Sequence, residues 1–277
     1  MNLQQLVKNA LKEDIGKGDW TTQSLVDPNC SGTAQVFSRS SGVISGIGIF
    51  TEVFHQIDET IIVETHLRDG DAIQRDEIVL CLTGRLAGLL TGERTALNFL
   101  GRMSGIAGMT RRFVDAVAGT GVEILDTRKT TPLLRELEKA AVRHGGGGNH
   151  RSGLYDMILI KENHIAAAGG IPAALRKVQE FLLNAKINVP IEIEVRNLDE
   201  LKQVLEFRFD RIMLDNFRPE TARQAVEIVN GRCPLEISGG VNLENICEFA
   251  QTGVQYISVG ALTHSASAHD FSMIIRE

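Results

Sequence analysis

Three basic clusters occur within a window of roughly 40 residues, and two of them follow an apolar run. The first is Thr127–Lys129, shortly after the run Val122–Leu125. The second is His150–Arg151, after four consecutive glycines and an asparagine, and the third is Lys161, directly after Met157–Ile160. Arginine and lysine side chains gathered in this way can bind carboxylates and phosphates through charge-assisted hydrogen bonds.

The window 126–164 is basic, although the chain as a whole is acidic. It contains seven Lys and Arg against five Asp and Glu, whereas the rest of the chain has 22 against 30. Fixed cations in a cleft focus the electric field and favour a small, highly anionic ligand. The alternative is a solvated helix face, which fits the i,i+3 and i,i+4 spacing of Arg135, Glu136, Glu138, Lys139 and Arg143. It does not fit Arg128, Lys129, Arg151 and Lys161, for which we favour a function.

Length and composition exclude several classes of protein. The 277 residues suffice for one or two domains, and 43% hydrophobic with 23% charged residues is typical of a soluble globular chain. A sequence pI near 5.7 argues against a nucleic-acid binder. We expect a cytoplasmic protein, because no signal-peptide or membrane-helix pattern is found and the cysteines are scattered without a C-x-x-C pair, at Cys30, Cys81, Cys233 and Cys247.

The first hundred residues predict an α+β layer with an antiparallel sheet. An amphipathic helix begins at Leu3, and a second helix is predicted over Ile49–Gln56. The strand-like runs between turn formers are Thr33–Phe37, Gly42–Ser45, Ile61–Glu64 and Glu77–Leu82. The helical pattern over Gly92–Ala118 is expected to be broken into two or three pieces by Gly101, Gly105 and Gly108.

The rest of the chain alternates between strands and helices, which implies parallel strands with right-handed crossovers. The predicted strands are Val122–Leu125, Met157–Ile160, Ile191–Val195, Arg211–Leu214, Leu235–Ile237 and Tyr256–Val259. The predicted helices are Pro132–His144, Pro172–Asn184, Leu198–Leu205, Pro219–Val229 and Leu243–Gln251. Six strands in this length indicate a small, incomplete barrel.

Polar residues follow the carboxyl ends of these strands, where the active sites of β/α barrels are found. They include Lys161, Glu194 and Asp215. Glu192 and Glu194 alternate on one strand and would share the barrel interior, where acids need cations or substrate as partners. Glu194 and Asp215 offer oxygens to Mg²⁺ or to ribose hydroxyls, or alternatively pair with Lys161 or Lys129.

Two glycine turns after the last strands favour phosphate binding. Ser238–Gly240 and Val259–Ala261 each precede a predicted helix or loop and can offer backbone N–H groups to an anion. The run Gly145–Gly148 is not a P-loop, because no Lys-Ser or Lys-Thr pair follows it. These residues together indicate a barrel enzyme that holds a sugar phosphate on one side and a carboxylated anion against an Arg/Lys wall.

With these motifs in place, the chain resembles the quinolinate phosphoribosyltransferase family over nearly its whole length. The segments that carry the resemblance are Gly18–Thr22, Glu93–Asn98, Asp126–Pro132, Gly146–Leu154, Leu159–His164, Leu214–Asn216 and Val259–Ser265. The resemblance implies an N-terminal open-faced α/β sandwich, residues 1–108 joined by 266–277, and a C-terminal incomplete (β/α) TIM-like barrel, residues 109–265. It also implies a homodimer with shared active sites, or a higher oligomer of it.

The resemblance implies transfer of the phosphoribosyl group from phosphoribosyl pyrophosphate to quinolinate with decarboxylation, giving nicotinate mononucleotide, pyrophosphate and CO₂ in NAD biosynthesis. It assigns quinolinate binding to Arg128, Arg151 and Lys161, helped by His150 and by Arg94 of the other subunit. It assigns phosphoribosyl pyrophosphate and Mg²⁺ to Lys129, Glu194 and Asp215, which would be the catalytic residues. The remaining substrate-binding residues would be Thr127, Ser238, Gly239, Gly240, Val259, Gly260, Ala261 and His264.

The chain departs from the family pattern at Leu133, Ala140, His144 and Gly148, none of which is an expected ligand. Two alternatives remain open. One is a related paralogue linked to molybdenum transport, against which the intact Asn149–Arg151 and Lys161 argue. The other is a non-catalytic anion-binding protein, which would not need Glu194 and Asp215.

Overall fold

The computed structural model describes residues 2–276 and divides them into two compact units. The first unit contains the chain up to Arg111, the segment Thr130–Gly146 and the segment from Leu262 onward. The second unit contains Arg112–Lys129 and Gly147–Ala261. The domain boundaries expected from the sequence, residues 1–108 with 266–277 and residues 109–265, stay a prediction.

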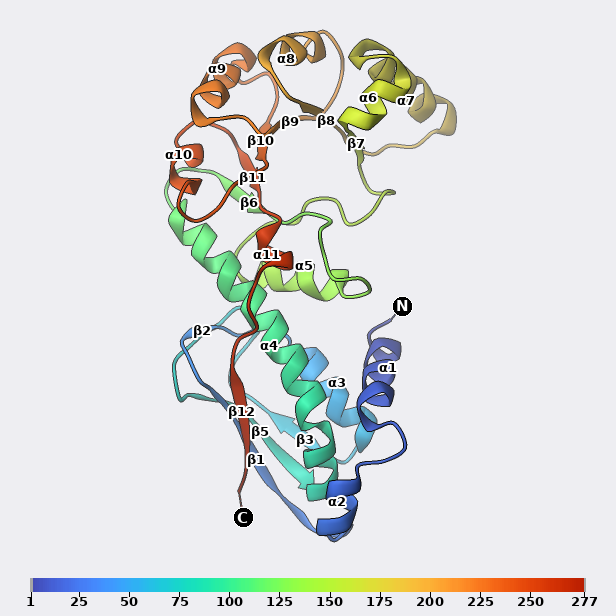
Figure 1. Ribbon diagram of the computed structural model, residues 1–277, viewed down its shortest axis with the longest axis vertical. Helices are drawn as coiled ribbons and strands as arrows, with labels where there is room; N and C mark the ends of the chain where they lie inside the picture. Colours follow the sequence, from blue (N-terminus) through green and yellow to red (C-terminus); the bar gives the residue numbers. More distant parts are fainter. Residues whose placement is uncertain (1, 277) are drawn as a thin grey trace. The chain divides into compact units, whose positions relative to one another are not determined.

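An antiparallel sheet of four strands forms the layer that the sequence predicted for the first unit. Its strand order is β12-β1-β5-β3, so the last strand of the chain lies beside the first (Figure 1). The strands are β1 (Ser31–Ser38), β3 (Ile62–Glu64), β5 (Ile78–Arg85) and β12 (Phe271–Arg276), and a separate two-stranded sheet pairs β2 (Gly42–Val43) with β4 (Ala72–Ile73). Strand β12 and the short β4 were not predicted from the sequence.

The helices of the first unit supply part of its apolar core. The helices are α1 (Leu3–Ile15), α2 (Trp20–Leu25), α3 (Ile47–Ile57), α4 (Leu86–Ala116), α5 (Arg135–His144) and α11 (Ala261–His264), where α4 and α11 extend into the second unit. Phe50 and Phe54 of α3 are buried with ring centroids 5.1 Å apart. They belong to one apolar cluster with Val36 and Leu80 of the sheet and Leu89 of α4. Burial of this shared surface stabilises the unit.

Helix α4 is one continuous helix, so the predicted breaks at its glycines are wrong. Gly101 and Gly105 instead allow the C-terminal segment to approach the helix backbone. A Cβ at Gly101 would lie 2.7 Å from the His269 carbonyl oxygen, and one at Gly105 would lie 2.0 Å from that of Ser267. These glycines are explained by close packing, which local propensity could not distinguish from a helix break.

A parallel sheet of six strands forms the second unit, in the order β6-β11-β10-β9-β8-β7, which confirms the six predicted strands. The strands are β6 (Glu123–Leu125), β7 (Ile158–Ile160), β8 (Ile191–Val195), β9 (Arg211–Asp215), β10 (Leu235–Ser238) and β11 (Tyr256–Ser258). The helices along the sheet are α6 (Glu162–Ala168), α7 (Ile171–Ala185), α8 (Leu198–Val204), α9 (Pro219–Val229) and α10 (Ile246–Ala250) (Figure 1). This is the incomplete TIM-like barrel that the sequence predicted.

The strands of the second unit are largely apolar, because parallel strands are covered on both faces. Ile193, Ile212 and Ile237 are fully buried. Glu192 and Glu236 are equally buried on β8 and β10, which is exceptional for ionisable groups. Among residues 2–276, no helix is long and apolar enough to cross a lipid bilayer.

We predict opposite effects for two glycine substitutions in α4. Gly105→Ala should destabilise the protein by about 1–3 kcal/mol, because the added methyl group overlaps a backbone carbonyl. Gly108→Ala should stabilise it by about 0.5–1 kcal/mol, because nothing lies within 4 Å of the new Cβ and alanine favours helix. Urea unfolding of both variants measures this, and a stabilising Gly105→Ala would contradict the packing argument.

Candidate active site

The polar residues predicted from the sequence lie along the carboxyl edge of the parallel sheet. Register pairs Val195 with Leu214 and Ser238 with Asp215, while Ser258 pairs with both Ser238 and Leu125. Adjacent strands therefore end side by side, and the residues that follow them share one edge. Those residues are Thr127, Arg128 and Lys129 after β6, Lys161 after β7, Glu194 on β8, Asp215 on β9, Ser238, Gly239 and Gly240 at β10, and Val259, Gly260 and Ala261 after β11.

Lys161 and Glu194 form an ion pair between Nζ and Oε1 at this edge. The Lys161 side chain is 47% exposed and that of Glu194 is 12% exposed, so a ligand can reach the lysine. Lys161 stands at the start of α6, and its backbone N–H donates to His164 Nδ1 at 3.0 Å. The sequence left pairing with Lys161 as an alternative role for Glu194, and the structure shows that this pair forms.

Arg151 is buried close to a second cation. Its Nη1 donates to the Met157 carbonyl oxygen at 3.2 Å. Burial lowers the pKa of the Arg151 guanidinium below its ordinary value, and the charge of Arg128 lowers it further. Two neighbouring guanidinium groups repel each other in a partly buried setting, so this arrangement favours an anion between or beside them.

Asp126 fixes the glycine-rich loop that carries His150. Its Oδ1 accepts from the His150 backbone N–H at 2.8 Å, and its Oδ2 accepts from the Asn149 side chain at 2.7 Å. Gly148 bridges to β6, where an added Cβ would lie 2.1 Å from Glu123 Oε1. The buried carboxylate therefore determines where His150 and Arg151 lie, a role that sequence reasoning did not assign to it.

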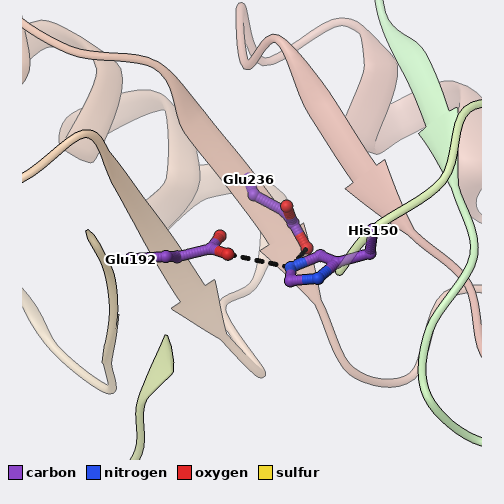
Figure 2. A group of neighbouring side chains, drawn as sticks. All are labelled: His150, Glu192 and Glu236. Atoms are coloured by element: carbon purple, nitrogen blue, oxygen red, sulfur yellow. Dashed lines mark ion pairs between the residues drawn. The ribbon is translucent and has the colours of Figure 1, made fainter. Parts of the chain in front are cut away.

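His150, Glu192 and Glu236 form a buried cluster, in which the histidine of the glycine-rich loop meets acids from two strands of the parallel sheet (Figure 2). His150 Nε2 lies 2.8 Å from Glu192 Oε2 and 3.6 Å from Glu236 Oε1. Arg211 Nη1 pairs with Glu236 Oε2 at 2.8 Å. Burial raises the pKa of Glu192 to about 7, and burial together with the charge of Glu192 raises the pKa of Glu236 to about 7.

The turn after β10 needs its glycines. Gly239 and Gly240 have φ of 96° and 67°, and a Cβ at Gly239 would lie 2.2 Å from Asn216 Oδ1. Asn216 itself has φ of 56° and donates its side-chain N–H to Asp215 Oδ2 at 3.0 Å. These left-handed conformations fit a turn that presents backbone N–H groups.

Two expected substrate-binding residues belong to the first unit. Arg94 is exposed on α4 and lines a hollow of about 420 Å³ with Asn98 and His269. His264 is exposed at the end of α11, and its Nδ1 contacts Ser265 Oγ at 2.7 Å. Arg94 and His264 are therefore described only by their contacts within the first unit.

The interpretation of Glu138 and Lys139 as solvated helix-face charges is wrong. Glu138 is fully buried and Lys139 is 3% exposed. Glu138 Oε1 accepts from Arg102 Nη2 at 2.8 Å and from Thr131 Oγ1 at 2.7 Å. The helical spacing was read correctly, but it does not reveal which face α5 buries. Glu236 was also missed, although its position two residues before Ser238 places it on the same face of β10.

Comparison with known proteins matches both halves of the chain to one family. Residues 19–104 match "Quinolinate phosphoribosyl transferase, N-terminal domain", and residues 106–274 match "Quinolinate phosphoribosyl transferase, C-terminal domain". The chain belongs to the quinolinate phosphoribosyltransferase family. A probable nicotinate-nucleotide pyrophosphorylase (carboxylating) of Bacillus subtilis is 43% identical over 99% of this chain and 93% of its own.

Solved structures of this family have the same fold. The nicotinate-nucleotide pyrophosphorylase of Francisella tularensis is 40% identical, with a TM-score of 0.94 over 99% of this chain and 96% of its own. That of Ehrlichia chaffeensis is 41% identical, with a TM-score of 0.94 over 100% of this chain and 99% of its own. These comparisons confirm the family resemblance and the fold class drawn from the sequence.

We predict that Glu236→Gln weakens the pH dependence of stability. The pKa of the Glu236 carboxyl is raised in the folded protein from the ordinary value of 4.5 to about 7. Protonation of such a group stabilises the folded state; this stabilisation is complete below pH 4.5 and is lost as the pH rises through about 7. Between about pH 6 and about pH 7.5, the variant should lose about 1–2 kcal/mol less stability than the unchanged protein. Urea unfolding at both pH values measures this difference.

Glu220→Gln, an exposed change on α9, is the control and should leave the pH dependence as it is. An unchanged dependence in Glu236→Gln would show that Glu236 titrates normally.

Proposed function

We propose that this chain transfers the phosphoribosyl group from phosphoribosyl pyrophosphate to quinolinate with decarboxylation. The products are nicotinate mononucleotide, pyrophosphate and CO₂, as expected of a pentosyltransferase in NAD biosynthesis. The observation that carries the proposal is the carboxyl edge of the parallel sheet, where Lys161 meets Glu194 and Arg151 lies near Arg128. Membership of the family supports the same reaction.

The cations at this edge suit a dicarboxylate. Arg128, Arg151 and Lys161 are the residues we assign to quinolinate, because arginine forks bind carboxylates in a bidentate manner and a lysine adds a point charge. Burial of Arg151 strengthens its attraction to an anion, since the dielectric constant is lower there. We assign Arg94 to the same substrate, contributed by the second subunit.

Lys129, Glu194 and Asp215 are assigned to phosphoribosyl pyrophosphate. The donor set fits Mg²⁺, because carboxylate oxygens on the adjacent strands β8 and β9 are hard ligands, and Mg²⁺ commonly uses one or two carboxylates together with substrate phosphates. When bound, Mg²⁺ would neutralise charge on the pyrophosphate. The turns at Ser238–Gly240 and Val259–Ala261, with Thr127 and His264, complete the substrate-binding set.

The protein residues contribute mainly by position and charge. The ring nitrogen of quinolinate attacks C1 of the ribose, the bond from C1 to the pyrophosphate oxygen breaks, and positive charge develops on the ribose. Lys129, near the departing group, stabilises its negative charge. The 2-carboxylate then leaves as CO₂, its electron pair stays on the ring carbon beside the new pyridinium nitrogen, and a proton replaces the lost carboxylate.

The oligomeric state of the protein and its location in the cell are also proposals. We propose a homodimer in which Arg94 of one subunit completes the site of the other, as the family resemblance implies. A cytoplasmic location stays a prediction, based on the scattered cysteines, which are free in the structure.

We predict that Arg151→Ala and Lys161→Ala each lower quinolinate turnover by roughly a hundredfold or more. Removal of one partner from a desolvated charge pair costs on the order of 3–5 kcal/mol. Steady-state kinetics measure the loss, with circular dichroism to verify the fold. Arg223→Ala, an exposed change on α9, is the matched control and should retain normal turnover. Near-normal activity in either site variant would contradict the carboxylate-binding assignment.

We predict that two inactive variants complement each other. Arg94→Ala and Lys161→Ala proteins, refolded together in equal amounts, should give about half mixed dimers. Each mixed dimer has one intact and one doubly damaged site, so about a quarter of all sites should regain activity.

Complementation distinguishes a shared site from a site within one chain. If Arg94 acts within its own chain, every site still lacks one residue and the mixture stays inactive. Absence of recovery despite demonstrated subunit exchange would refute the shared site.

A further inference from the structure

The carboxylate of Asp156 holds the loop that joins Arg151 to β7. Residues 152–156 belong to no helix or strand, so no regular backbone pattern fixes them. Asp156 Oδ2 accepts from the Ser152 backbone N–H at 2.6 Å, and Oδ1 accepts from the Gly153 backbone N–H at 2.9 Å. The two residues that follow Arg151 are therefore tied to the far end of the loop.

The guanidinium of Arg151 is held from that same end. Its Nη1 donates to the Met157 carbonyl oxygen at 3.2 Å, and Met157 comes directly after Asp156 in the chain. Arg151 Nε is buried and has no hydrogen-bond partner among the described residues. The bond to the Met157 carbonyl is therefore the hydrogen bond that orients the guanidinium.

Together these contacts close a ring. From the Arg151 backbone the path runs through the N–H groups of Ser152 and Gly153 to the Asp156 carboxylate. It then returns through the Met157 carbonyl to Arg151 Nη1. Without the Asp156 carboxylate the loop would gain conformational entropy, so this ring would open.

The two ends of the loop are fixed by other contacts. Before it, the His150 backbone N–H donates to Asp126 Oδ1 at 2.8 Å. After it, the Ile158 backbone N–H donates to the Pro190 carbonyl oxygen at 2.9 Å, where β7 begins. Between these two anchors, Asp156 determines the course of the chain.

Asp156 also places a negative charge near Arg151. Burial lowers the pKa of the Arg151 guanidinium, the charge of Arg128 lowers it further, and the charge of Asp156 raises it. The carboxylate therefore offsets part of the repulsion between the two arginines.

We propose that Asp156 is a positioning residue for quinolinate, because its carboxylate folds the loop so that the Met157 carbonyl aims Arg151 at a carboxylate of the substrate. This inference rests on the proposed function. It assigns a role to an acid that the reaction itself does not use, and Asp156 acts through Arg151 without contact with the substrate.

The first measurement concerns geometry and needs no substrate. In crystals of Asp156→Ala protein, Arg151 Nη1 should lie beyond hydrogen-bond distance from the Met157 carbonyl oxygen, while β7 and β8 keep their register. Crystals of the unchanged protein are the control. Retention of this bond in Asp156→Ala would overturn the proposal, whatever reaction the protein catalyses.

Matched variants separate hydrogen bonding from charge. Asp156→Asn removes the charge but keeps one oxygen acceptor, whereas Asp156→Ala removes both acceptors. Calorimetry should show quinolinate binding weakened about tenfold in Asp156→Ala and about threefold in Asp156→Asn, with binding of phosphoribosyl pyrophosphate unchanged. Tyr155→Phe, an exposed change in the same loop, is the control and should bind quinolinate normally.

Two results of this comparison would overturn the proposal. Equal losses of quinolinate binding in Asp156→Ala and Asp156→Asn would show that the charge acts without the hydrogen bonds. A parallel loss of phosphoribosyl pyrophosphate binding would show general damage to the unit.

A double-variant cycle tests whether Asp156 acts through Arg151. Alone, Asp156→Asn should lower kcat/KM for quinolinate about threefold, but added to Arg151→Ala it should lower it no further. Urea unfolding verifies the fold of each variant. A full additional loss in the double variant would overturn the proposal. Absence of turnover in the unchanged protein would count against the proposed function alone, because the crystal geometry does not depend on it.

Discussion

The candidate site depends on holding like charges close together. Arg128 and Arg151 are near enough for one to lower the pKa of the other, and Arg151 is buried. Repulsion of this kind is tolerated only where the backbone is rigid and the opposite charge is supplied nearby. Here both arginines lie in loops beside the carboxyl edge of a parallel sheet, and the opposite charge near Arg151 is supplied by Asp156, Glu192 and Glu194.

Other residues of the second unit help to hold these like charges in place. The buried Asp126 holds the loop that carries His150 and Arg151, and Gly148 allows this loop to lie against β6. Burial disfavours the charged forms of the interior acids, as the raised pKa values of Glu192 and Glu236 show. Glu192 lies beside His150 and Glu236 pairs with Arg211, so each interior acid has a polar neighbour inside the unit.

The sequence predicted the six parallel strands well, because short apolar runs alternate with helical patterns, and this alternation favours parallel strands. It also predicted which polar residues follow the strands, since the carboxyl edge is determined once the strands are parallel. The chemical roles of those residues came from the family resemblance, and they stay predictions until variants are measured.

Other features depend on contacts between distant segments. Gly105 appears to local reasoning as a helix break, but it faces the carbonyl of Ser267, 162 residues later in the chain. Glu138 has the spacing of a surface charge, but its partner Arg102 comes from another helix. Strand β12 was missed because its pairing partner β1 lies at the opposite end of the sequence. Spacing alone contains none of this information.

The stoichiometry of the complete reaction tests the proposed activity of this chain. Purified protein is incubated with Mg²⁺, phosphoribosyl pyrophosphate and quinolinate labelled with ¹⁴C at the 2-carboxylate. We expect labelled CO₂ and pyrophosphate in equal amounts, with nicotinate mononucleotide as the product and no release when either substrate is omitted. Release of pyrophosphate without labelled CO₂, or binding of both substrates without turnover, would contradict it.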